Sequence, residues 1–216
     1  MKTDELIIQL ASMPGRTRRL APPWRRSALW LALSAVYVAL VIFLRPDGFS
    51  GVGISDPRFV IEQIATLATA ITAAIAAFCS IVPGYDRRWL LLPIAPLLIW
   101  IAALGEGCVH DWLDWGSTGL QVHNDWACLP VAATLGVVPA LAILLMLRRG
   151  APLVPHASLA LGAIAVGAVT NFAMRLFHYG DATIMVLVWH VGVAAAFALA
   201  ASLLGGQVLK WPRAPK

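Results

Sequence analysis

Six long apolar runs, nearly free of charge, divide this chain of 216 residues. They cover residues 27–44, 59–82, 89–105, 128–147, 157–177 and 183–206. Each run has about the 17–25 residues that a helix needs to cross the hydrocarbon core of a bilayer. Hydrophobic residues make up 60% of the chain and charged residues 12%, which is too few to cover the surface of a soluble globule. The sequence therefore predicts an all-α integral membrane bundle of six transmembrane helices.

The charges between these runs are sorted by side of the membrane. If the N-terminus is cytoplasmic, thirteen of the sixteen Lys and Arg residues lie inside and eight of the eleven acidic residues lie outside. The basic inner group is Lys2, Arg16, Arg18, Arg19, Arg25, Arg26, Arg87, Arg88, Arg148, Arg149, Lys210, Arg213 and Lys216. Basic residues favour the cytoplasmic side, so both termini are predicted there. Because topology accounts for the net charge of +5, we expect no direct nucleic-acid binding.

This topology divides the chain into three parts. They are a cytoplasmic N-terminal partner-binding segment at residues 1–26, a transmembrane domain at 27–206 and a cytoplasmic tail at 207–216. Within the first part, Leu6, Ile7 and Leu10 recur at helical spacing after an acidic first turn, which predicts a short amphipathic helix. Such a helix either lies on the inner leaflet, held by nearby arginines, or docks into a groove of a soluble partner.

A few polar residues interrupt the apolar runs. Arg175 lies near the outer end of its span and is expected to extend to the lipid headgroups, with a buried functional charge as the alternative. Glu62 is interpreted in the same way. His190 lies deeper and is predicted to be buried with a hydrogen-bonded partner. Pro93 and Pro96 are predicted to kink the third helix.

The outer loop at 106–127, with the residue that follows it, gathers side chains able to bind metals or form a disulfide. Cys108, His110, Asp111, His123, Asp125 and Cys128 all fall within 21 residues. Their spacing matches no tight zinc template, so a disulfide, unpaired residues with interface roles and a metal site all remain open. Cys108, His110, His123 and Cys128 are the weak metal candidates. His178 and His190 differ in depth, which disfavours a bis-histidine haem, and no cofactor is expected.

Catalytic motifs are missing from the sequence. We find no nucleophile elbow, no helical zinc-binding HExxH motif and no phosphate-binding glycine loop. A binding or sensing protein is therefore favoured over an enzyme. The alternative is a small transporter or cofactor-bearing membrane protein that uses the His and Cys residues of the outer face.

Several short segments, in matching order along the chain, resemble the NrsF family of membrane anti-sigma factors. They are residues 1–7 (MKTDELI), 45–47 (RPD), 83–84 (PG) with Arg87 and Arg88, 147–152 (LRRGAP), Trp189 with His190, and 205–206 (GG) with Trp211. The resemblance implies a six-span protein of the bacterial inner membrane. Its cytoplasmic N-terminus would hold an extracytoplasmic-function sigma factor until a periplasmic or membrane stress, such as an oxidant or a metal, releases it.

If the N-terminal segment binds a sigma factor, we expect Leu6, Ile7 and Leu10 to supply the apolar anchors and Arg18 and Arg19 to meet its acidic groups. The resemblance itself bears on the outer side of the protein. Members of the family carry two important cysteines on the outer side. The first corresponds to Cys128, whereas this chain has His178 at the second place. Cys108 acting as the partner of Cys128, and a metal shared by Cys128 and His178, are the two hypotheses for sensing, with His190 as a further candidate.

Overall fold

The computed structural model describes residues 3–12, 20–44, 56–122, 128–150, 153–176 and 183–209, and every regular element among them is helical. Five spans are single long helices: α2 (Pro23–Phe43), α3 (Pro57–Cys79), α4 (Ile94–Trp115), α5 (Cys128–Arg148) and α6 (Pro155–Arg175). The last span joins α7 (Thr183–Met185), the π-helical η3 (Val186–Val191) and α8 (Gly192–Val208). All six are long and apolar enough to cross a membrane, so the predicted six-span all-α fold is confirmed.

Proline marks where three of these helices begin. Pro23, Pro57 and Pro155 each occupy the first helical position, where the missing N–H would have had no partner within the helix. At the start of α3 the Asp56 side chain also accepts a hydrogen bond from the backbone N–H of Arg58, at 3.0 Å. These local signals fix the ends of the helices independently of how the helices pack.

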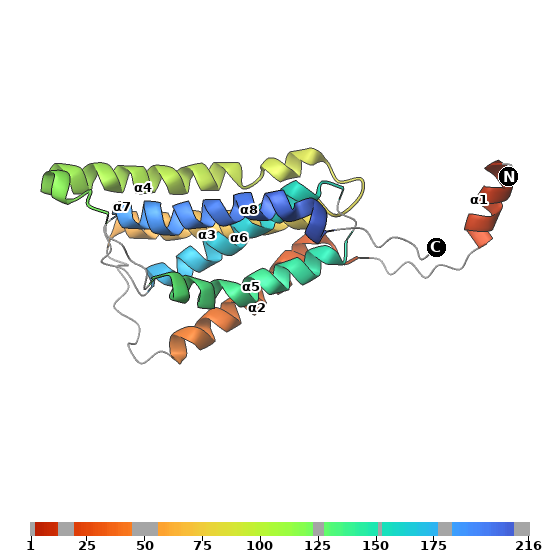
Figure 1. Ribbon diagram of the computed structural model, residues 1–216, viewed down its shortest axis with the longest axis horizontal. Helices are drawn as coiled ribbons and strands as arrows, with labels where there is room; N and C mark the ends of the chain where they lie inside the picture. Colours follow the sequence, from red (N-terminus) through yellow and green to blue (C-terminus); the bar gives the residue numbers. More distant parts are fainter. Residues whose placement is uncertain are drawn as a thin grey trace.

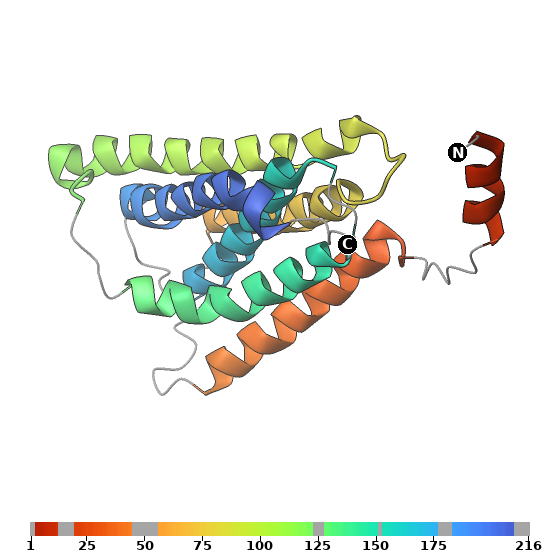
Figure 2. The same cartoon turned by 45° about the vertical axis from the view of Figure 1, so that its right-hand side comes forward.

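Helices α3 and α6 form the centre of the bundle. About half of each apolar span is buried, 56% for α3 and 50% for α6, against 11% for the last span. Helix α6 packs against α3, α5 and α8, while α3 also packs against α2 and α4 (Figures 1 and 2). Small residues such as Ala73, Ala77 and Ala165 are fully buried, which lets the central helices approach closely.

The third span differs from its predicted boundaries. A 3₁₀-helix, η1 (Arg87–Leu91), precedes α4, and Pro93 stands just before α4 begins. Pro96 lies in the first turn, so neither proline kinks the helix interior as predicted. At its C-terminal end α4 runs to Trp115 and is followed by η2 (Gly116–Thr118). Residues 106–115, predicted as loop, are helical because the backbone continues its own hydrogen bonds beyond the apolar run.

The predicted N-terminal helix is present as α1 (Thr3–Ser12), with Asp4 and Glu5 in its first turn. Figures 1 and 2 show α1 separate from the bundle, beyond the end at which α2 begins. The side chains of Ile7 and Ile8 are 58% and 68% exposed. An apolar surface is thus available on a helix that the membrane domain does not cover.

Candidate functional site

A buried ion pair joins the two central helices at the end of the bundle farthest from α1 (Figures 1 and 2), the end that the charge pattern predicts to be the outer one. Arg175 of α6 donates from Nε to Glu62 Oε1 at 3.1 Å and from Nη2 to Glu62 Oε2 at 3.0 Å. The two residues are only 7% and 5% exposed. The expectation that Arg175 and Glu62 extend to the headgroups is therefore wrong, and the buried-charge alternative holds. Each side chain neutralises the charge of the other, which offsets part of the cost of burying both.

Neighbouring side chains support this pair. The Arg175 guanidinium lies 5.5 Å from the centre of the Phe59 ring, within the range of a cation–π contact. One turn away, Gln63 Nε2 donates to the backbone carbonyl of Phe172 at 3.3 Å. The outer ends of α3 and α6 are thus held together by charge, by a ring contact and by a side-chain to backbone hydrogen bond.

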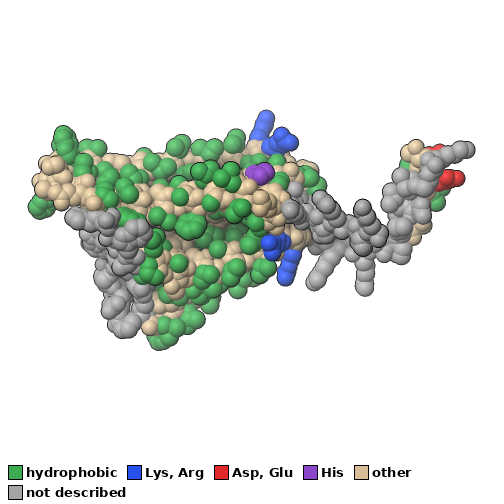
Figure 3. Space-filling view, in the orientation of Figure 1, with side chains coloured by type: hydrophobic (Ala, Val, Ile, Leu, Met, Phe, Trp, Pro, Cys, Tyr) green, Lys and Arg blue, Asp and Glu red, His purple; other side chains and the backbone are tan. Residues whose placement is uncertain are grey.

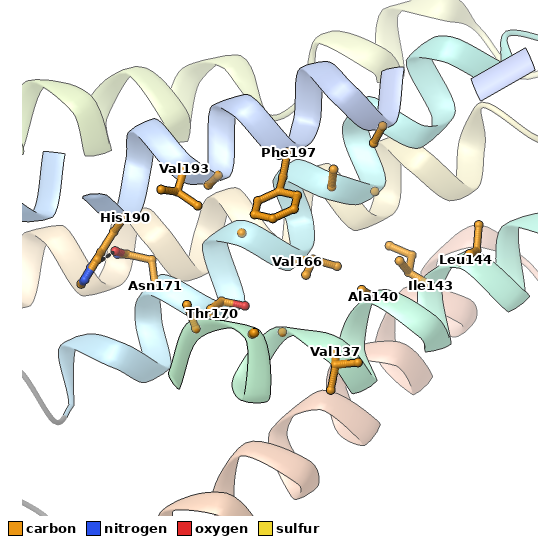
Figure 4. Close-up of a pocket in the computed structure, with 18 of the residues that line it drawn as sticks. Val137, Ala140, Ile143, Leu144, Val166, Thr170, Asn171, His190, Val193 and Phe197 are labelled. Carbon is orange, nitrogen blue, oxygen red and sulfur yellow. Dashed lines mark hydrogen bonds between the residues drawn. The ribbon is translucent and has the colours of Figure 1, made fainter. Parts of the chain in front are cut away.

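His190 is buried and hydrogen-bonded, as predicted. Its Nδ1 lies 3.0 Å from Asn171 Oδ1, and both side chains are drawn in Figure 4. His190 comes from the π-helical η3, and Asn171 lies one turn before Arg175 on α6. π-helical turns are rare and occur often at functional sites. The last span is therefore joined to α6 by a polar contact close to the buried ion pair.

The cysteines and histidines of the outer side are spread over two helices that pack on different neighbours. Cys108 and His110 lie on α4, which packs against α3, whereas Cys128 begins α5, which packs against α2 and α6. Cys108 carries a free thiol, so no disulfide joins it to Cys128 in this structure. Within the described ranges no three His, Cys, Asp or Glu residues are placed to hold a metal ion. His123 and His178 lie outside the described residues.

Instead, His110 and its neighbours form an exposed polar cluster. Glu106 Oε1 lies 3.6 Å from Arg58 Nε and 3.7 Å from His110 Nε2. Asp111 Oδ2 accepts a hydrogen bond from the backbone N–H of Thr183 at 3.0 Å, which ties α4 to the start of the last span. The outer ends of α3, α4, α6 and the last span are thus linked by polar contacts.

A second group of contacts, which the sequence did not reveal, ties α2 to α5. Trp30 Nε1 donates to the Pro139 carbonyl at 2.9 Å, and the Tyr37 hydroxyl donates to the Thr134 carbonyl at 2.6 Å. Near the start of α2, buried Arg26 donates to the Met146 carbonyl and lies 4.6 Å from the centre of the Phe78 ring. The acceptors are backbone carbonyls more than 90 residues away, which leave no signature in the sequence.

The predicted partner-binding residues belong to α1 and the stretch after it. Ile7 is exposed, as an anchor for a partner must be. Leu6 and Leu10 lie on the same helix, but their side chains are outside what the structure describes, as are Arg18 and Arg19. Nothing in the bundle brings α1 to the outer polar contacts, so binding and sensing would occupy opposite ends of the molecule.

The family model for NrsF, described as negative regulator of sigma F, matches residues 10–211. No curated protein and no solved structure matches the chain. The match covers all six spans and most of the chain outside them.

Proposed function

Since this chain belongs to the NrsF family of negative regulators of sigma F, we propose that it is a membrane-bound anti-sigma factor for a sigma factor of the extracytoplasmic-function class. The family match over nearly the whole chain is the observation that carries the proposal. The six apolar spans are consistent with a regulator that keeps its target at the membrane. Its action is binding, not catalysis.

Helix α1 is the proposed docking element for the sigma factor. It is ten residues long and has an apolar face built from Leu6, Ile7 and Leu10. A helix of this kind binds by laying its apolar face into a hydrophobic groove of the partner. The exposed Ile7 side chain supports this role, and Arg18 and Arg19 would meet acidic groups beside the groove.

The proposed location is the bacterial inner membrane, with both termini in the cytoplasm. Arg25, Arg87 and Arg88 are exposed at the start of α2 and around η1. Figure 3 shows Lys and Arg side chains gathered at the end of the bundle nearest α1. Basic residues are retained on the cytoplasmic side, which supports placing α1 where a sigma factor is available.

Sensing would take place at the opposite end. Cys108, Cys128, His178 and His190 remain the proposed sensing residues, responding to an oxidant or a metal. A change there would alter how the outer ends of α3 and α6 pack, and α3 also contacts α2, which leads to the N-terminal segment. The buried pair of Glu62 and Arg175 supports this proposal because its strength depends closely on helix spacing.

The test is capture of the sigma factor by the full-length protein in detergent, comparing Leu6→Asp with Ile8→Asp. Both variants place one carboxylate on α1, but Leu6 belongs to the proposed docking face and Ile8 points about 160° away from it around the helix. Leu6→Asp should reduce capture at least tenfold, because burying an unpaired carboxylate in the groove is costly. Ile8→Asp should bind within about twofold of the unchanged protein.

Equal binding by both variants would remove α1 from the sigma-binding surface. Failure of the unchanged protein to capture any extracytoplasmic-function sigma factor of the same organism would count against the anti-sigma role itself. The two results are distinguishable: equal binding by both variants still yields a complex with the sigma factor, whereas a failed anti-sigma role yields none.

A further inference from the structure

Two arginines from different helices lie close together at the end of the bundle nearest α1. Arg26, in the first turn of α2, is only 6% exposed. The Met146 carbonyl accepts a hydrogen bond from its Nη2, and the centre of the Phe78 ring lies 4.6 Å from its guanidinium. Arg149 directly follows α5, is exposed and repels the Arg26 guanidinium. Because these contacts hold Arg26 in place, the two like charges cannot separate, and an anion beside them would relieve the repulsion.

No carboxylate within the described part of the bundle forms an ion pair with these arginines. Asp86, the described acid at this end of the bundle, serves η1 instead. It accepts a hydrogen bond from the backbone N–H of Arg88 at 2.9 Å and lies 3.9 Å from Arg88 Nε. The acidic residues of α1 lie apart from the bundle (Figure 2). Arg25 and Arg148, next to the pair in the sequence, add two exposed positive charges. An anion from outside the chain would balance this excess.

The exposed arginines stand at the ends of two apolar stripes on neighbouring helices that pack against each other. On α2, the stripe that begins at Arg25 consists of exposed residues at intervals of three or four: Leu29, Leu33 and Val36. On α5, the stripe that ends at Arg149 consists of exposed residues at intervals of four: Leu141 and Leu145. Neither of these two leucines lines the cavity that opens between α5, α6 and α8.

These stripes indicate the depth of the arginines in the membrane. Exposed apolar side chains along a span contact the lipid chains, so an arginine at the end of such a stripe lies where the chains meet their headgroups. Trp24, exposed and next to Arg25, is of the residue type enriched at this level. The anion nearest to hand at this depth is the phosphate of a phospholipid.

We propose that the start of α2 and the end of α5 bind the headgroup of an anionic phospholipid, phosphatidylglycerol. Exposed Arg25 and Arg149 donate to the phosphate oxygens, which guanidinium groups match in geometry, and the acyl chains lie along the two stripes. Buried Arg26 does not touch the lipid and acts through its charge. A zwitterionic lipid binds less well, because its own ammonium group already balances the phosphate. The bound lipid would hold the start of α2 at the membrane surface.

The test is native mass spectrometry of the purified full-length protein in detergent, with equal amounts of phosphatidylglycerol and phosphatidylcholine that carry the same acyl chains. The unchanged protein should retain phosphatidylglycerol about tenfold more often, and Arg149→Gln should reduce this preference about fivefold. Arg149→Gln should fold normally, because it removes an exposed charge that repels Arg26. Arg87→Gln is the matched control. It removes one exposed charge from η1 at the same end and should keep the preference.

Thermal unfolding gives a second measurement on the same proteins. Phosphatidylglycerol should raise the melting temperature of the unchanged protein and of Arg87→Gln above the value in phosphatidylcholine, because a ligand stabilises the state that binds it. In Arg149→Gln this difference should disappear, while the melting temperature in phosphatidylcholine should be no lower than that of the unchanged protein. A lower value there would mean that Arg149 supports the fold and not a lipid site.

Four further results would overturn the proposal. Equal retention of both lipids by the unchanged protein would mean that the headgroup is not recognised. An equal loss in Arg87→Gln would reduce the effect to the general charge of this end. Displacement of the lipid by millimolar inorganic phosphate would assign the arginines to a soluble phosphate. Loss of sigma-factor capture in Arg149→Gln with an unchanged lipid preference would assign them to the sigma factor. Lipid retention is measured without sigma factor, so its failure leaves the anti-sigma role untouched.

Discussion

Arg175 and Glu62 illustrate what a single residue's position in the sequence leaves open. Each lies near the end of an apolar run, where extension to the headgroups is the usual solution for a lone charge. Only their pairing across α3 and α6, 113 positions apart, makes burial preferable. His190 was easier to predict, because a histidine deep in a span needs a partner whichever residue provides it. Only the structure identifies that partner as Asn171.

At the residue scale we predict that Arg175→Leu lowers the free energy of unfolding by about 3–5 kcal/mol, because it leaves the Glu62 carboxylate buried without an opposite charge. The double variant Glu62→Leu with Arg175→Leu should recover most of that loss, since no charge remains to be buried. Denaturation in mixed detergent micelles measures both values. A double variant as unstable as the single one would show that packing around the pair, and not its charge, holds the outer ends together.

Helix α8 depends on close contact with α6 at its inner end. A Cβ atom on Gly205 would lie 2.6–2.7 Å from backbone atoms of Pro155 and His156, which cannot move aside. His156 Nδ1 also lies 2.6 Å from the Ser202 carbonyl, which fixes the same approach. A short contact also joins the two central helices, α3 and α6. The hydroxyl oxygens of Ser80, just after α3, and Ser158, on α6, lie 2.7 Å apart. Small side chains and short polar contacts, not large apolar ones, set these helix spacings.

The corresponding prediction compares neighbouring glycines of α8. Gly205→Val should force α8 away from α6 and destabilise the protein by about 1–3 kcal/mol, the usual cost of overpacking. Gly206→Val is the matched control, because a Cβ there meets only the tip of the His156 ring, at 3.4 Å and beyond. Thermal unfolding of the two variants in the same detergent measures the difference. Similar melting temperatures for both would mean that α6 and α8 are not tightly packed at this end.

Across the whole molecule, two polar regions lie at opposite ends of the central helices. The outer one joins α3, α4, α6 and the last span, and the inner one holds the start of α2 against α3 and α5 through Arg26. Helix α3 takes part in both. Movement of α3 is therefore the most direct route by which an outer signal would reach the segment before α2.

For the molecule as a whole we predict its orientation in the membrane, with both termini in the cytoplasm. In a background with Cys79→Ala, Cys108→Ser and Cys128→Ser, we introduce Ser117→Cys or Arg87→Cys, both at exposed positions. A membrane-impermeant maleimide should label the cysteine at 117 in intact spheroplasts, and the one at 87 only after permeabilisation, because basic segments stay in the cytoplasm. The opposite pattern would reverse the orientation and place α1 outside, where no sigma factor is found.

The sequence by itself determined the six spans, the first residues of two of them, Cys128 and Thr183, and the amphipathic α1. These are local properties: hydropathy is summed over about twenty neighbouring residues, and proline acts at its own position. The tertiary structure decided which charges pair, which carbonyls accept from Arg26, Trp30 and Tyr37, and where the cavity opens. In lipid both the buried and the exposed faces of a helix are apolar, so the sequence of a span carries little record of its rotation or of its neighbours. Only the packed helices bring Glu62 to Arg175 and leave a cavity open between α5, α6 and α8.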